Sequence, residues 1–135
     1  FRQDLRANYA EMKRFGIKKE DAFYFLPPYE WYNDTIARWT EMEDLQLINF
    51  SRGTISHADY TTPQDSNYRT NESIYNSILK FERESKSGLN GFLLLMHIGV
   101  APERTEKFYS ELQNLIHYLK EKGYTFKTVD ELLKN

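Results

Sequence analysis

Cysteine is absent from this chain of 135 residues, which excludes disulfide bonds, thiolate nucleophiles and cysteine-ligated metals. A cysteine-free chain suits either redox environment, so the compartment stays open. No apolar run reaches the ~18 residues that a membrane span requires, and we expect no span. Lysine and arginine form no cluster, and 18 basic against 20 acidic residues give a net charge of −2. Because nucleic-acid affinity depends on clustered basic side chains, we expect no nucleic-acid partner.

Proline is scarce, yet two of the four prolines are adjacent at Pro27 and Pro28, within the stretch FYFLPPYEWYND. Three aromatic residues follow them directly and surround one carboxylate: Tyr29, Trp31 and Tyr32. Exposing such rings costs about 25 cal/mol per Å2 of apolar surface, which favours burial or a ligand. Both alternatives remain open: the rings belong to the core, or they contact a ligand.

Apolar periodicity and punctuation by Gly, Pro and Asn predict helices alternating with short apolar strands. The predicted helices cover residues 5–15, 33–43, 74–81, 103–122 and 129–135. The predicted strands cover residues 22–26, 45–50, 92–98 and 124–129. Residues 51–71 are polar and read as a long loop. Alternation with strands this apolar implies a parallel sheet covered by helices. We therefore predict an α/β fold with about four parallel strands, in one domain spanning residues 1–135.

In parallel α/β folds, functional side chains collect at the carboxyl ends of strands. The third predicted strand ends at His97, and the loop after the second contains Asp59. An imidazole there could transfer protons, or it could be a core histidine with one hydrogen bond to the backbone. Asp59 could be its carboxylate partner, or it could solvate a turn. The other two histidines, His57 in the loop and His117 within a predicted helix, rank below His97.

Two segments together resemble the polysaccharide deacetylases, which are family-four carbohydrate esterases. FYFLPPYEWYN resembles their third motif, a strand that runs into Arg-Pro-Pro-Tyr. GFLLLMHIG, followed by a helix and LKEKGYTFKTVDELL, resembles their fifth motif and closing elements. The similarity covers essentially the whole chain. It implies the carboxyl-terminal half of a distorted (β/α) barrel that acts on an acetylated polysaccharide or oligosaccharide.

The resemblance also implies roles for single residues. Pro28 would stiffen one wall of a sugar groove, and the backbone N–H of Tyr29 would hold the oxyanion of the tetrahedral intermediate. Trp31 would contact the sugar, and Leu95 would line the pocket for the acetyl methyl. At the same groove, the third strand's histidine (His97) would be the general acid that protonates the leaving group. The loop aspartate, Asp59, would orient that acid or the arginine of the third motif.

The chain departs from the family in two respects. Leu26 stands where the family has arginine, which Arg52 from the next loop could replace. The Asp-Asp and His-x-x-x-His motifs, which supply the family's base and the ligands of a divalent metal, normally zinc, have no counterpart before Phe23. We therefore expect this chain itself to hold no cofactor. An alternative interpretation is a non-catalytic carbohydrate-binding or scaffold module. A phosphate-binding α/β protein is disfavoured, because no Gly-rich loop follows a strand.

The chain opens on Phe1 rather than Met, so we expect it to be a piece of a longer polypeptide. Half of a barrel leaves open strand edges, which invite pairing. The expected partners are therefore the missing amino-terminal half of the barrel or a second copy of this chain. Family members mostly meet their polymers outside the cytoplasm, so the resemblance implies an exported parent protein.

We predict that the chain alone releases no acetate from chitooligosaccharides or acetylated xylan, even with added Zn2+ or Co2+. The reason is that hydroxide is scarce at neutral pH unless a bound metal lowers the pKa of water towards ~7. An acetate-release assay measures this directly. Robust turnover would contradict the interpretation that the base and metal motifs are missing.

Overall fold

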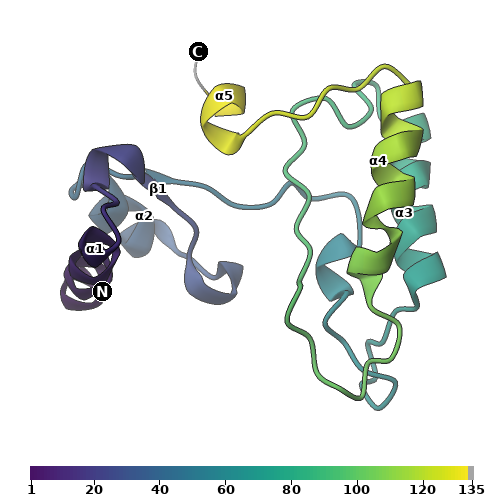
Figure 1. Ribbon diagram of the computed structural model, residues 1–135, viewed down its shortest axis with the longest axis horizontal. Helices are drawn as coiled ribbons and strands as arrows, with labels where there is room; N and C mark the ends of the chain where they lie inside the picture. The colour runs from purple at the N-terminus through teal and green to yellow at the C-terminus, as the bar shows by residue number, and fades with distance from the viewer. Residues whose placement is uncertain (134–135) are drawn as a thin grey trace. The chain divides into compact units, whose positions relative to one another are not determined.

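A computed structural model describes residues 1–133, and the chain divides into unit 1, Phe1–Asn49, and unit 2, Phe50–Asn135 (Figure 1). Unit 1 contains helix α1 (Arg2–Arg14), turn η1 (Lys19–Asp21), strand β1 (Tyr24–Phe25), turn η2 (Pro28–Glu30), helix α2 (Asp34–Glu41) and strand β2 (Gln46–Leu47). Unit 2 contains η3 (Ser56–Ala58), α3 (Asn71–Glu84), η4 (Phe108–Glu111), α4 (Leu112–Glu121) and α5 (Val129–Leu133). Among residues 1–133, no helix has both the length and the apolar character needed to cross a membrane.

Unit 1 is organised around a short parallel strand pair. Strands β1 and β2 pair with Tyr24 opposite Gln46. Helix α2 connects them, and its start is defined by Asn33, whose side chain accepts a hydrogen bond of 3.0 Å from the Ile36 N–H. This capping satisfies one of the backbone donors left unpaired at a helix start. The predicted start of this helix near residue 33 is therefore confirmed. The crossover helix brings the two strands into the parallel pairing that the alternating pattern predicts.

The first helix differs in one respect from its prediction. Leu5 is buried, as the apolar spacing predicts, but Phe15 is 75% exposed. Helix α1 ends at Arg14, and Phe15 is its C-cap, followed by Gly16 at a φ of +79°. Because Phe15 lies beyond the last helical residue, it does not continue the apolar face. The predicted helix therefore ends one residue earlier than expected.

The core of unit 2 lies between helices α3 and α4, which run side by side (Figure 1). Its buried members are Ile74, Ile78, Phe108, Leu115 and Leu119. Partly buried apolar side chains from the segment before η4, Leu94 and Met96, pack against this cluster. The core therefore fixes the two helices and also one side of the segment that leads to His97.

Three predicted elements of unit 2 take another form. In the described part of the chain, residues 92–98 and 124–128 belong to no strand. The predicted helix over residues 103–122 begins only at Phe108. Before it, the chain turns at residues 101–104, where the Arg104 N–H donates to Ala101 O at 3.1 Å. The predicted half barrel, its four strands and the single domain stay predictions.

We predict that Ile78→Ala lowers the free energy of unfolding by about 2–5 kcal/mol, since it opens a cavity in the α3–α4 core. Urea denaturation followed by far-UV circular dichroism measures the change. Phe126→Ala is the control, because Phe126 is 53% exposed and a surface substitution changes stability by about 0.5 kcal/mol or less. Equal effects of the two substitutions would contradict the assigned core.

Candidate functional site

The Asp59 carboxylate accepts two hydrogen bonds from His97. Oδ2 accepts from the His97 backbone N–H at 2.7 Å, and Oδ1 lies 2.6 Å from the ring Nδ1. Asp59 is only 1% exposed, whereas the His97 side chain keeps 32% of its surface exposed. A carboxylate only accepts hydrogen bonds, so Nδ1 carries the proton and Nε2 is the second ring nitrogen, available for another partner. The pair is thus a buried anion that orients a partly exposed imidazole.

A closed turn holds Asp59. Its N–H donates to Ser56 O at 3.2 Å, at the end of η3. Two residues later, Thr61 donates to Ala58 O through both its N–H, at 3.1 Å, and its hydroxyl, at 2.7 Å. Thr61 is itself buried. The carboxylate therefore projects from a short turn whose backbone and side-chain donors are bonded on both sides of it.

A different segment delivers His97. Residues 92–98 are joined to Ser51 through Leu93. The Ser51 N–H donates to Leu93 O at 2.9 Å, and the Ser51 hydroxyl accepts from the Leu93 N–H at 3.0 Å. The Tyr60 ring contacts the imidazole edge-on, with centroids 5.3 Å apart. Leu95 is partly buried, two residues before His97. The imidazole thus lies beside an aromatic ring and a buried carboxylate.

The structure distinguishes between the alternatives for these residues. The His97 ring bonds to a carboxylate rather than to the backbone, and Asp59 is buried rather than solvating a surface turn. His117 is exposed and pairs with Glu121 at 3.3 Å. The His57 ring stacks on Phe50, with centroids 5.0 Å apart. Among residues 1–133, a buried acidic partner is thus found for His97 and for neither of the other two histidines, and the catalytic role of His97 stays a prediction.

The diproline turn of unit 1 has an unusual backbone. Tyr29 and Glu30 both adopt positive φ, +57° and +58°, a left-handed conformation that costs non-glycine residues on the order of 1 kcal/mol or more each. The turn is held by a 2.9 Å bond from the Glu30 N–H to Pro27 O and a 3.0 Å bond from Asn49 Nδ2 to Glu30 O. Pro27 is buried, which anchors the turn on its inner side.

The aromatic rings after the diproline are surface residues. Tyr29 is 87% exposed and Trp31 is 84% exposed. These two rings therefore do not belong to the core. Pro28 and Tyr32 are also exposed. Within the part of the chain that the structure describes, the Tyr29 N–H donates to no acceptor. The turn therefore presents a free backbone donor and uncovered rings.

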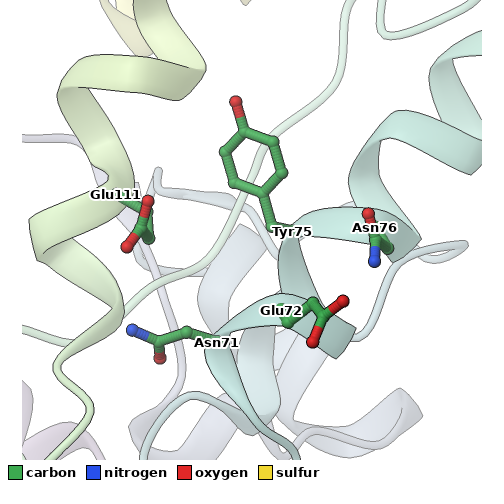
Figure 2. A pocket seen from close by; sticks show the side chains of 5 residues that line it. All are labelled: Asn71, Glu72, Tyr75, Asn76 and Glu111. Carbon is green, nitrogen blue, oxygen red and sulfur yellow. The ribbon is translucent and has the colours of Figure 1, made fainter.

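A separate pocket of about 260 Å3 lies on the surface of unit 2 (Figure 2). Its lining residues are Asn71, Glu72, Tyr75, Asn76 and Glu111. Burial, and then the negative charge of Glu111, raise the pKa of Tyr75 above its ordinary value. None of the residues predicted from the sequence lines this pocket, and its walls combine two carboxylates with a tyrosine.

Two positions of the family's chemistry remain without an equivalent. Leu26, at the position of the family's arginine, is 45% exposed, and Arg52 is exposed. Among residues 1–133, no three His, Asp or Glu side chains are arranged to hold a metal ion. The expectation that this chain holds no cofactor stays a prediction, and no chemical step is assigned to a metal.

Sequence reasoning missed Tyr60 and Arg104. Tyr60 carries no signal beyond its place next to Asp59. Arg104 lies in the polar stretch PERTEK, which is typical of a solvated surface, although the structure buries it completely.

A search of protein-family models, curated proteins and solved structures found no match to the chain. The likeness to polysaccharide deacetylases thus stays a resemblance of motifs.

We predict that His97→Ala and Asp59→Asn are not additive in their effects on stability, with a coupling energy of about 1–3 kcal/mol. The reason is that either change alone leaves a buried polar group without its partner. Urea denaturation of both single variants and the double variant measures the coupling.

The control for this cycle is the exposed pair, His117→Ala and Glu121→Gln. Ion pairs between helix residues four positions apart contribute about 0.5 kcal/mol or less, so we expect a coupling energy no larger than this. Similar coupling energies for the two pairs would mean that the Asp59–His97 contact contributes no more than a surface ion pair.

Proposed function

We propose that this chain carries the proton-donating part of a carbohydrate deacetylase site, which removes N- or O-linked acetyl groups from an acetylated polysaccharide. The observation that carries the proposal is the buried Asp59 carboxylate, bonded at 2.6 Å to Nδ1 of a partly exposed imidazole. Such an arrangement fixes the tautomer and the orientation of the His97 ring, as a general acid requires.

The acid step follows from this geometry. In the tetrahedral intermediate, the carbon–nitrogen or carbon–oxygen bond to the sugar must break. The protonated His97 gives its Nε2 proton to the departing amine or alcohol, and acetate is released as the other product. Asp59 keeps its bond to Nδ1 throughout and offsets the positive charge of the ring. General acid catalysis of this kind accelerates a reaction by about 100- to 10,000-fold.

The remaining roles concern substrate binding. Trp31 and Tyr29 offer exposed rings for stacking on sugar faces. The free Tyr29 N–H suits the oxyanion, because Pro28 and the bonded Glu30 keep its direction fixed. Leu95 offers an apolar surface for the acetyl methyl. The activation of water is assigned to no residue of this chain and belongs to the amino-terminal half of the barrel. We propose this half, or a second copy of the chain, as the partner, and an exported protein as the parent.

A second candidate function is a carbohydrate-binding module without catalysis. Leu26 favours it, because a leucine cannot make the ion pair that the family's arginine makes with the catalytic base. Both functions require a bound sugar, and they differ in whether recognition depends on the acetyl group. The deacetylase proposal requires that dependence, because the reacting group itself must be held near His97 and Leu95.

We predict that N-acetylated chitopentaose perturbs the backbone NMR signals of Trp31 and His97, and that its fully deacetylated form does so at least tenfold more weakly. Trp31→Ala weakens the affinity about tenfold, equivalent to about 1.4 kcal/mol of lost stacking. Acetylated xylopentaose, titrated in the same way, tests the O-linked alternative.

Phe15→Ala is the matched control, because Phe15 is an equally exposed aromatic residue elsewhere in unit 1. Equal binding of acetylated and deacetylated sugars would favour the binding module. Absence of binding by both acetylated oligosaccharides would overturn the proposed function.

A further inference from the structure

Arg104 is the largest fully buried side chain in the described structure, with 0% of its surface exposed. None of the ion pairs among residues 1–133 includes it. A guanidinium is always charged, and arginine is almost never fully buried without a partner. Removing such a charge from water costs several kcal/mol unless hydrogen bonds compensate. The contacts of Arg104 must therefore be specific.

The hydrogen bonds of Arg104 all end on one loop. Nη1 donates to Thr61 O at 2.7 Å and to Arg69 O at 3.0 Å, and Nη2 donates to Asn71 Oδ1 at 2.9 Å. The guanidinium carbon also lies 5.4 Å from the centre of the Tyr68 ring. The acceptors are neutral oxygens, and the planar fork of the guanidinium reaches both ends of the loop at once.

This loop is the one that begins at Asp59, and Arg104 belongs to the segment that begins at His97. The two segments are thus joined at two places: Asp59 binds His97 at one, and Arg104 binds residues 61–71 at the other. Glu106 reinforces the second, because its Oε2 accepts from the Asn71 N–H at 2.9 Å. A shift of one segment along the other would break both junctions together.

We propose that Arg104 is a positioning residue for the Asp59–His97 pair and acts through Thr61. Thr61 lies two residues after Asp59 and closes the turn that carries it, with two bonds to Ala58 O. Arg104 holds the remaining polar group of Thr61, its carbonyl oxygen. Because Asp59 makes two short bonds to one residue, a displacement of the turn by a fraction of an ångström is enough to weaken them.

The geometry of the pair can be read from the His97 ring by NMR. A proton shared between Nδ1 and a carboxylate is strongly deshielded and exchanges slowly with water, and long-range nitrogen–proton spectra identify the tautomer. We expect the unaltered chain to hold His97 as the Nδ1–H tautomer. In Arg104→Met, we expect that proton to exchange at least tenfold faster and the tautomer to become mixed, while circular dichroism retains the folded signal.

Two further variants separate positioning from general disturbance. Arg104→Lys keeps the charge without the fork, so we expect a partial return towards the original spectrum. Lys107→Met removes a cation from the same segment that bonds only to Ala101 O, and we expect no change at His97. The exposed His117 serves as an internal reference in every sample.

A folded Arg104→Met protein with an unchanged His97 spectrum would overturn the proposal. If that variant does not fold, Asn71→Ala removes one acceptor of Arg104 and leaves the arginine in place. We then expect a smaller change of the same direction at His97, and an unchanged spectrum would again overturn the proposal. These measurements use no sugar, so their outcome does not depend on the proposed deacetylase function. Only the conclusion that Arg104 positions a catalytic pair rests on that function.

Discussion

A buried charge has to find its hydrogen-bond partners inside the protein, and unit 2 contains two such charges of opposite sign. Asp59 bonds both carboxylate oxygens to His97, and Arg104 bonds its two terminal nitrogens to oxygens of residues 61–71, whereas its buried Nε has no partner among the described residues. The two charges are not paired with each other. Each instead joins the same two segments, so the arrangement of these segments follows from the need to satisfy both.

The α3–α4 core supplies the frame for this arrangement. Helix α3 starts at Asn71, directly after the loop that receives Arg104, and η4 starts at Phe108, directly after the segment that carries it. Ile74 and Phe108 belong to the same buried cluster. Packing of the two helix starts therefore brings the ends of both segments together, and the polar contacts then select their register.

Some features of the structure were predictable from the local sequence, and others were not. The cap at Asn33 and the strand pair were predictable, because local donors and short apolar runs determine them. Residues 92–98 look like a strand in the sequence because Leu94 and Met96 are apolar, yet these side chains pack on helices instead of forming a sheet with partners. The later start of the helix, at Phe108, was not predictable from apolar spacing, because that spacing does not show the turn at residues 101–104.

The candidate site shows the same division. Its position at a strand-like end and its residue types, His97 and Asp59, were predictable from the sequence. Their contact could not be derived from spacing, because it joins residues 38 positions apart. Arg104 could not be predicted either, since its burial depends on carbonyl oxygens that only the folded loop brings together. The chemical roles, and the placement of this unit within a barrel, rest on the motif resemblance.

The diproline turn carries a tyrosine and a glutamate where the backbone alone would prefer glycine or asparagine. Replacing both with glycine would relax the left-handed geometry, but the ring and the carboxylate would disappear. The turn therefore presents a ring and a carboxylate side by side at a backbone cost that two glycines would not carry.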